Sequence, residues 1–287
     1  MFACKVILIV LAVIAVLYLL MLRGRTGRPG LAAFQGQVFA HRGYHGGPDA
    51  PENSLEAFRR AAARGFGSEL DVHLLRDGHL AVLHDSALQR MTGADGDVED
   101  LEAAQLPSYA LAHSAETIPT LEQVLAVYGG RGPLIIELKT RGRNAAALCT
   151  EVCRVLDGYG GAFCLESFDP RCLLWLRRHR PELIRGQLSD DFLKNRCGLD
   201  WLGAFLETYL LANCVTRPDF IAYRYQDRHN LSNRLCRGLW HMAGASWTIH
   251  SAEELHTAQA EGLWPIFENF DPAQSSSAAG LAGAAEA

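Results

Sequence analysis

Acidic and apolar residues alternate along one short stretch of the chain, where the sequence most clearly offers chemistry. Residues 68–85 are Ser-Glu-Leu-Asp-Val-His-Leu-Leu-Arg-Asp-Gly-His-Leu-Ala-Val-Leu-His-Asp. The period of two predicts a strand, and the Asp-Gly pair predicts a tight turn into a second strand. Glu69, Asp71 and His73 then share one face of the first strand.

The carboxylates of Glu69 and Asp71 would repel each other at this spacing unless a cation lies between them. A hard divalent cation such as Mg²⁺ or Ca²⁺ takes oxygen ligands and would satisfy both groups. His84, at the end of the second strand, could reach the same place. A solvent-facing strand with charged ends would show the same alternation, so this stretch alone leaves both interpretations open.

The elements that would position these side chains alternate between strands and helices. Strands are predicted to start at Val38, Ser68, Leu80, Leu134, Ala162, Leu183, Asp219 and Ala245, with a short further strand at Trp264–Phe267. Repeated strand–helix units predict an α/β fold, a closed TIM-type (β/α)8 barrel with its site at the carboxyl ends of the strands. A polar, irregular segment at about 86–119 is predicted to be an insertion that forms a small lid or subdomain.

Two other predicted strand ends also carry polar side chains. The strand that begins the domain ends in His41 and Arg42, and a nearly continuous apolar run ends in Glu137 and Lys139. A barrel would gather these residues at one rim, although Glu137 and Lys139 could also be a simple ion pair on one face.

The combined set suits the hydrolysis of a phosphate ester. A metal held by Glu69, Asp71 and Glu137 would polarise a phosphoryl oxygen. Arg42 and Lys139 would neutralise the negative charge that develops on the phosphate. His41 would act as the general base on the attacking oxygen, and His84 as the general acid on the departing alcohol.

A longer series of motifs follows the same order along the chain. It comprises His41-Arg42-Gly43, Pro51-Glu52-Asn53-Ser54, Glu69-Leu70-Asp71-Val72, Asp77-Gly78, His84-Asp85, Ile136-Glu137-Leu138-Lys139, Ser167-Phe168 and Trp247-Thr248. This series resembles the glycerophosphodiester phosphodiesterase family. The resemblance implies a TIM-type barrel with a small insertion after the third strand, one divalent cation on Glu69, Asp71 and Glu137, and an acid/base pair at His41 and His84.

The resemblance also implies an activity in phospholipid and glycerol metabolism. Family members hydrolyse glycerophosphodiesters to sn-glycerol 3-phosphate and an alcohol, and some cut lysophospholipids instead. The chain departs from the family at residues 267–270, where Phe-Glu-Asn-Phe stands in place of the usual Thr-Asp-x-Pro. This departure concerns the substrate pocket rather than the metal site.

Four further residues in or near the motifs are interpreted from their residue type and their position in the sequence. Glu52 is interpreted as a residue that orients the site, with an ordinary loop residue as the alternative. Trp247 is expected either to stack on a glycerol or head group or to fill the barrel mouth. His73 and His79 are expected at the surface.

The amino terminus predicts a membrane anchor. Residues 6–22 form an uncharged apolar run, which reaches the lower length limit for a membrane-spanning helix. We interpret residues 1–23 as an uncleaved single-pass anchor, 24–36 as a linker, 37–273 as the barrel domain and 274–287 as a disordered tail. A cleaved signal peptide is the alternative, but its apolar core would be shorter and a small-x-small cleavage site would follow.

Charge and cysteine usage predict where the domain lies. Arg23, Arg25 and Arg28 follow the apolar run, whereas only Lys5 and the amino terminus precede it. The positive-inside rule therefore places the catalytic domain in the cytoplasm. An odd set of cysteines without a regular framework, Cys149, Cys153, Cys164, Cys172, Cys197, Cys214 and Cys236, is typical of a reducing compartment.

The overall charge argues against one class of partner. A net charge of −5 and a pI near 6.1 provide no basic surface for nucleic acid. The expected partners are a glycerophosphodiester or lysophospholipid substrate and a membrane, and no protein partner is predicted. Two other function classes stay open: a catalytically silent binder of lipid or phosphodiester, and a phospholipase D of the sphingomyelinase type.

Overall fold

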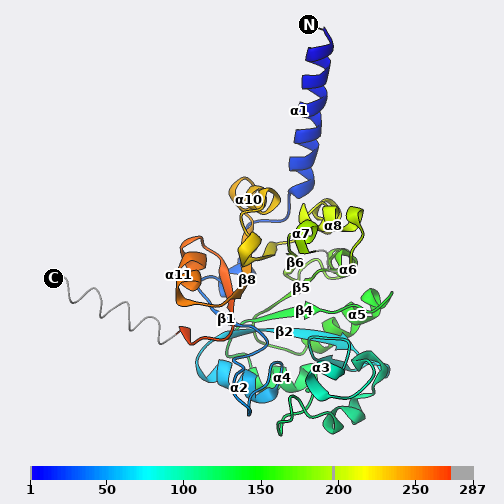
Figure 1. Cartoon of the computed structure of the whole chain (residues 1–287), viewed down its shortest axis with the longest axis vertical. Coiled ribbons are helices and arrows are strands. Elements are labelled where there is room, and N and C mark those ends of the chain that lie inside the picture. Colours follow the sequence, from blue (N-terminus) through cyan, green and yellow to red (C-terminus); the bar gives the residue numbers. More distant parts are fainter. Residues whose placement is uncertain (1, 196–197, 273–287) are drawn as a thin grey trace, which may run out of the picture.

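Eight parallel strands close into a barrel (Figure 1). The computed structural model of the protein describes residues 2–195 and 198–272. The barrel strands are β1 (Phe39–Ala40), β2 (Gly67–Leu74), β4 (Leu134–Leu138), β5 (Phe163–Ser167), β6 (Arg185–Ser189), β7 (Phe220–Arg224), β8 (Ala243–Ile249) and β9 (Trp264–Phe267). Because β1 pairs with both β2 and β9, the ring is complete, and the predicted TIM-type α/β barrel is confirmed.

The predicted strand at Leu80 does form, but its assignment to the barrel is wrong. This strand, β3 (Leu80–Val82), pairs antiparallel with β2 and lies outside the ring. A tight turn can only connect antiparallel strands, whereas a parallel neighbour needs a longer crossover. The eighth barrel strand is instead β9, and the insertion therefore follows the second barrel strand rather than the third.

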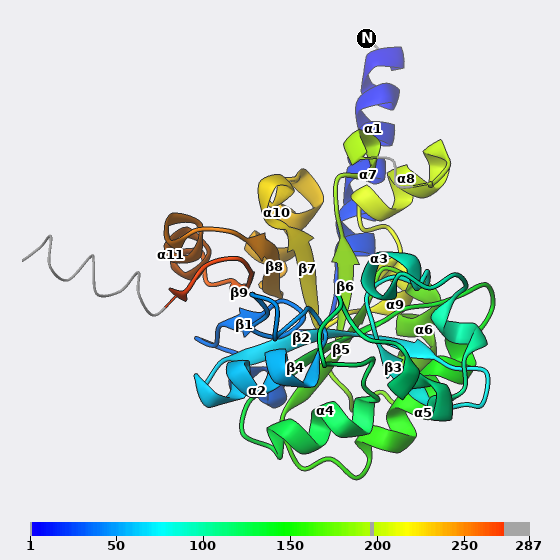
Figure 2. The same cartoon turned by 60° about the horizontal axis from the view of Figure 1, so that its bottom comes forward.

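Helices cover the outer face of the barrel (Figures 1 and 2). They are α2 (Leu55–Ala63), α4 (Leu121–Tyr128), α5 (Ala145–Leu156), α6 (Pro170–His179), α10 (Leu231–Gly238) and α11 (Ala252–Ala260). Between β6 and β7 the chain forms α7 (Phe192–Asn195), α8 (Trp201–Thr208) and α9 (Asn213–Thr216), and the short 3-10 helix η4 (Tyr225–Asp227) follows β7.

Alternation along the strands separates the outer core from the polar rim. Leu70 and Val72 of β2 point outward and pack with residues of α4 and α5, such as Val124 and Leu148. The residues between them therefore point into the barrel. Lower in the barrel, alternate residues such as Phe39, Ile135 and Phe220 form a separate apolar interior.

The segment at 24–36, interpreted as a linker, is part of the folded domain. It contains the short 3-10 helix η1 (Pro29–Ala33). Leu31 and Phe34 are buried in the cluster that fills the barrel interior, and Phe34 stacks on Trp264 with ring centroids 5.0 Å apart. This segment therefore helps to close the barrel.

The insertion at about 86–119 folds as a small subdomain beside β3. It contains α3 (Gln89–Thr92) and the 3-10 helices η2 (Val98–Asp100) and η3 (Ala103–Ser108). Its buried residues, among them Leu88, Val98, Leu106 and Ile118, form an apolar cluster with Leu83.

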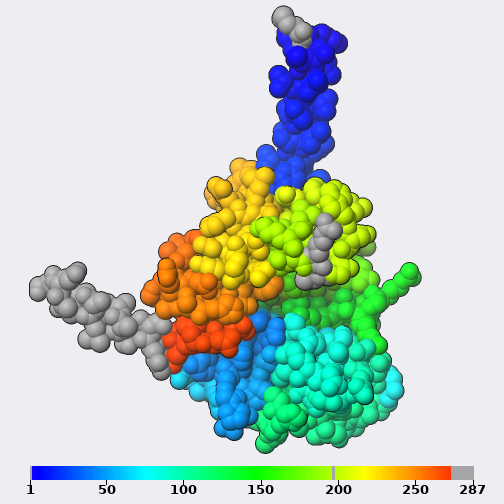
Figure 3. All heavy atoms as spheres, viewed as in Figure 1, coloured from blue at the N-terminus to red at the C-terminus, as the bar shows by residue number. Residues whose placement is uncertain are grey.

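The amino-terminal apolar run is a single helix, α1 (Phe2–Leu22), which projects from the body of the protein (Figures 1 and 3). Its length and composition are sufficient to cross a membrane. The final residue, Leu22, is fully buried among Leu210, Tyr223 and Met242 of the domain. The tail predicted at 274–287 lies outside the described residues.

We expect Gly186→Ala to destabilise the barrel, because a Cβ atom at Gly186 of β6 would collide with the ring of Phe220 on β7. Overpacking of this kind costs roughly 1–3 kcal/mol. Gly160→Ala is a matched control, because a Cβ atom there would meet no described atom within 4 Å. Urea unfolding of the purified protein in detergent measures the effect, and equal midpoints for the two variants would contradict the packing of β6 on β7.

Candidate active site

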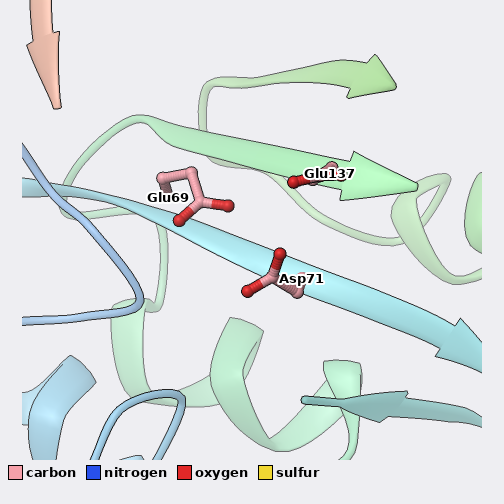
Figure 4. Close-up of side chains that lie close together, drawn as sticks. All are labelled: Glu69, Asp71 and Glu137. Atoms are coloured by element: carbon pink, nitrogen blue, oxygen red, sulfur yellow. The ribbon is translucent and has the colours of Figure 1, made fainter. Parts of the chain in front are cut away.

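Four carboxylates from three neighbouring strands gather at the rim of the barrel. Asp71 of β2 pairs in register with Glu137 of β4, and Glu137 pairs with Glu166 of β5, so these three side chains point to the same face. Glu69 lies two residues before Asp71 and points the same way. Figure 4 shows Glu69, Asp71 and Glu137 close together, and one oxygen from each lies within 4.8 Å of the others.

Two cationic side chains compensate part of this negative charge. Lys139 Nζ lies 3.0 Å from Asp71 Oδ1 and 2.8 Å from Glu137 Oε1, and Arg42 Nε lies 3.6 Å from Asp71 Oδ2. Asn53 Nδ2 donates to Asp71 Oδ2 at 2.9 Å. Burial alone would raise the pKa of Asp71, but Lys139 and the other nearby positive charges hold it well below its ordinary value.

The other acidic residues are not compensated to the same extent. Burial, together with the charges of Asp71 and Glu137, raises the pKa of Glu69 well above its ordinary value. Burial also raises the pKa of Glu137, despite the nearby Lys139. Glu69, Asp71 and Glu137 supply only oxygen ligands, and all three are buried. This donor set fits a hard divalent cation, which would relieve the repulsion between the carboxylates.

His41 is oriented by a residue from the other end of the chain. Its Nδ1 lies 2.6 Å from Oε2 of Glu268, which follows β9. Because a carboxylate only accepts, Nδ1 carries the proton and Nε2 stays free, 3.9 Å from Glu69 Oε2. Burial lowers the pKa of the His41 imidazole, and Glu268 partly opposes this shift.

His84 is held in the same manner by its neighbour in sequence. Its Nδ1 lies 2.7 Å from Asp85 Oδ1, and Asp85 in turn accepts from Arg90 Nε. Burial lowers the pKa of His84 to about 4, although Asp71 acts in the opposite direction. Arg90 also donates to Glu52 Oε1 at 2.6 Å, and Glu52 Oε1 accepts from Arg42 Nη1 at 2.9 Å.

A cavity of about 480 Å³ opens over these groups. Its lining includes the predicted residues His41, Arg42, Glu52, Glu69, His84, Glu137, Lys139 and Trp247. Asp71 lies beside it through its contacts with Lys139 and Arg42. The ring of Trp247 is edge-on to Phe168, with centroids 5.7 Å apart, so it forms part of the wall of the barrel mouth. The structure therefore brings together all the side chains that the sequence pattern selected.

One histidine lies elsewhere than expected. The prediction that His73 is a surface residue is wrong: it is 2% exposed, its Nδ1 lies 2.8 Å from Glu99 Oε1, and it joins β2 to the insertion. His73 lies two residues after Asp71 on β2, so its side chain is on the same face of the strand as Glu69 and Asp71. The alternation that places those residues inside therefore also places His73 inside. His79 is exposed, as expected.

Two acidic residues at the site were missed by the sequence analysis. Glu268 lies in the segment that departs from the family pattern, which was its only signal. Glu166 is 1% exposed, lines the cavity, and has no hydrogen-bond partner for Oε2 among the described residues. Burial raises its pKa well above the ordinary value. Its position directly before Ser167-Phe168 at a strand end was the available signal.

Comparisons with known proteins agree with this architecture. Residues 41–205 match the glycerophosphoryl diester phosphodiesterase family. A glycerophosphodiester phosphodiesterase of Bacillus altitudinis is 40% identical over 112 residues, which cover 37% of this chain and 45% of the relative. Human glycerophosphodiester phosphodiesterase 1 is 40% identical over 98 residues, which cover 31% of this chain and 29% of the relative. The matched segments thus span less than half of either relative.

Solved structures share the fold over most of the chain. An Oleispira antarctica phosphodiesterase in complex with the product sn-glycerol-3-phosphate superposes with a TM-score of 0.68 at 24% identity, covering 89% of this chain and 100% of that one. A glycerophosphodiester phosphodiesterase from Thermotoga maritima superposes with a TM-score of 0.60 at 25% identity, covering 80% of this chain and 93% of that one. The fold and the position of the site define a TIM-type barrel protein with a polar site at the carboxyl ends of its strands. Within that class, the chain belongs to the glycerophosphoryl diester phosphodiesterase family.

We expect Mg²⁺ or Ca²⁺ to raise the thermal stability of the protein, because a cation would bind the folded acidic cluster and not the unfolded chain. At 100 times the dissociation constant, the gain is about 2.7 kcal/mol. Glu69→Gln should remove most of this gain, whereas Glu122→Gln, on the exposed face of α4, should keep it. Thermal unfolding with either cation and with chelator measures the effect, and an equal cation response in both variants would contradict binding at this cluster.

Proposed function

We propose that the protein hydrolyses glycerophosphodiesters to sn-glycerol 3-phosphate and an alcohol. The observation that carries the proposal is the convergence, on one cavity, of a carboxylate cluster, two cationic side chains and two imidazoles that are each held by a carboxylate. Membership of the family supports the same reaction. The product bound in the Oleispira antarctica structure supports sn-glycerol 3-phosphate as one of the two products of the reaction.

One divalent cation, Mg²⁺ or Ca²⁺, is proposed as the cofactor, with Glu69, Asp71 and Glu137 as its ligands. When bound, it would supply Lewis-acid polarisation of a phosphoryl oxygen. The protein's own cations act on the same phosphate. The Arg42 guanidinium and Lys139 Nζ line the cavity and can neutralise charge that develops on the phosphoryl oxygens. Glu52 orients Arg42 through the 2.9 Å hydrogen bond.

The two imidazoles divide the proton transfers between them. His41 is the proposed base that takes a proton from the attacking oxygen, and Glu268 stabilises the imidazolium that results. His84 is the proposed acid that protonates the departing alcohol, with Asp85 fixing its ring. The negative charge of a bound phosphodiester favours a protonated His84, which burial otherwise opposes.

A lysophospholipid is the second candidate substrate, and a specific cavity favours it. A mainly apolar groove of about 570 Å³ shares His84, Lys139, Phe168 and Trp247 with the catalytic cavity and extends to Leu199. An acyl chain in this groove would lie next to the phosphate site. The groove equally supports the alternative of a phospholipase D acting on a complete lipid.

We also propose that α1 is a retained single-pass anchor and that the barrel domain lies in the cytoplasm. The carbonyl oxygens at the end of α1 are bonded by the domain: Trp240 Nε1 donates to Leu19 at 2.9 Å, and Asn213 Nδ2 donates to Leu22 at 3.2 Å. A segment destined for cleavage needs no such contacts. The arginines that follow α1, and the free thiols of the cysteines in the described residues, support the cytoplasmic side. Cys197 lies outside the described residues.

We expect His41→Ala and His84→Ala each to lower kcat/KM for glycerophosphocholine by roughly 10²–10⁴, the usual contribution of general acid–base catalysis. His79→Ala is the matched control, because its imidazole is exposed on the hairpin. Choline release under saturating Mg²⁺ or Ca²⁺ measures the reaction. Binding without turnover by the unmodified protein would identify a silent binder and refute the proposal.

We expect Leu199→Glu to raise KM for a short-chain lysophosphatidylcholine by about tenfold or more, the loss of about two buried CH₂ groups. Glycerophosphocholine has no chain to place in the groove, so its kinetics should be unchanged and serve as the internal control. Parallel steady-state assays on the two substrates test this, and an unaltered KM for the lysolipid would exclude the groove as its acyl site.

A further inference from the structure

Exposed apolar side chains are concentrated at one end of the barrel domain. Outside α1, the large hydrophobic residues that are exposed in the described part of the chain all come from residues 199–239. Those on the helices that surround the base of α1 are Trp201, Leu202, Leu206, Val215, Leu231 and Leu239, which we call the collar. Figures 1 and 3 show α8 and α10 on either side of the helix where it leaves the body.

The helix α8 turns its apolar side outward. Trp201 and Leu202 are 61% and 58% exposed, whereas Ala204 and Thr208 are buried. Phe205 stacks on Trp201 with ring centroids 5.5 Å apart, so the aromatic surface is continuous. A helix on a water-exposed surface normally has the opposite pattern, with its apolar face toward the core.

The helix α10 also exposes leucines at both of its ends, although Cys236 and Leu235 pack inward. Its buried residues include Ser232 and Asn233, whose side chains donate to the carbonyl oxygens of Thr208 and Arg228. Leu231 and the residue that caps its end, Leu239, are 57% and 48% exposed. Exposed leucines thus lie on both sides of α1, and such a concentration is typical of a surface covered by something apolar.

The length of α1 indicates what covers the collar. Residues 2–17 are exposed, and the helix contacts the domain from Tyr18 onward. The uncharged apolar run of residues 6–22, between Lys5 and Arg23, is about 26 Å long at 1.5 Å per residue, whereas the hydrocarbon core of a bilayer is about 30 Å thick. A spanning α1 therefore needs its last turn, from Tyr18 onward, inside the membrane, which brings α9 and α10, the helices that contact α1, to the membrane surface.

Charge at the same end fits the headgroup layer. A cavity of about 580 Å³ beside the base of α1 is lined by Arg23, Arg25, Arg28 and Arg217, together with Trp240, and its described lining contains no acidic side chain. Arg25 is paired with Asp219 beneath it, which leaves a net positive surface. Arginine and tryptophan at this depth favour the phosphates and the interface of an anionic leaflet.

We propose that the collar is a membrane-docking surface, and that it inserts into the interface of the bilayer that α1 spans. The occupant is the lipid headgroup region of an anionic leaflet. The inference rests on the proposal that α1 is a retained anchor and not on the proposed chemistry. Because the apolar groove beside the catalytic cavity reaches Leu199, just before α8, docking brings that groove to the lipid surface.

The test measures the depth of Trp201 in the full chain. The protein is reconstituted in nanodiscs of phosphatidylcholine and phosphatidylglycerol, with plain or brominated phosphatidylcholine. The contribution of Trp201 is the difference between the unmodified chain and Trp201→Phe. We expect bromine to quench this contribution by at least half. Trp175→Phe is the matched control, because Trp175 of α6 packs toward α5, on the core cluster that contains Ala145 and Leu148, and should report no quenching.

A paired variant tests the apolar contact itself. Leu202→Glu with Leu206→Glu should reduce the bromine quenching of Trp201 at least twofold, while hydrolysis of water-soluble glycerophosphocholine stays unchanged. The intact mass of the protein shows whether α1 is retained, and the diester assay shows whether the protein hydrolyses glycerophosphodiesters. Failure of the docking proposal can therefore be distinguished from failure of the anchor or of the proposed activity. Quenching of Trp201 by acrylamide but not by bromine would overturn the inference. Protection of Trp201 from both quenchers would also overturn it, because a protein partner would then cover the collar.

Discussion

The burial of several carboxylates at one end of a barrel is the constraint on which the rest of this structure depends. Parallel register places Asp71, Glu137 and Glu166 on adjacent strands at the same level, so repulsion between them is built into the fold. Lys139 relieves it only in part, because it contacts Asp71 and Glu137 alone. A site with this excess of negative charge suits the binding of a cation, and of an anionic substrate together with that cation. Ion pairs that serve only stability would not need more carboxylates than cationic groups.

In the proposed mechanism, the two imidazoles add proton transfer to these electrostatic interactions. Each has Nδ1 on a carboxylate, Glu268 for His41 and Asp85 for His84, which fixes the tautomer and leaves Nε2 available. The partner of His84 is its neighbour in sequence, whereas the partner of His41 lies at the end of the last strand. Closure of the barrel through β1 and β9 therefore also brings together the two parts of the candidate active site.

The end of the domain near α1 has an apolar surface, which suits contact with lipid better than contact with water. The 3-10 helix η1 fills the bottom of the barrel with Leu31, while the helices between β6 and β8 expose leucines around α1. The catalytic cavity and the apolar groove share Phe168 and Trp247, so the polar chemistry and the apolar surface meet at one wall. This arrangement is consistent with a phosphodiesterase that works at a lipid surface.

The sequence by itself determined the barrel, the apolar helix and most of the site, because these depend on local periodicity and on residue types at strand ends. Alternation alone places Glu69 and Asp71 on one face. Only the tertiary structure decided that β9 closes the ring against β1, that Glu99 of the insertion is the partner of His73, and that Glu268 holds His41. These features depend on which distant segments meet when the barrel closes, and the same residue types would satisfy local rules equally well in other pairings.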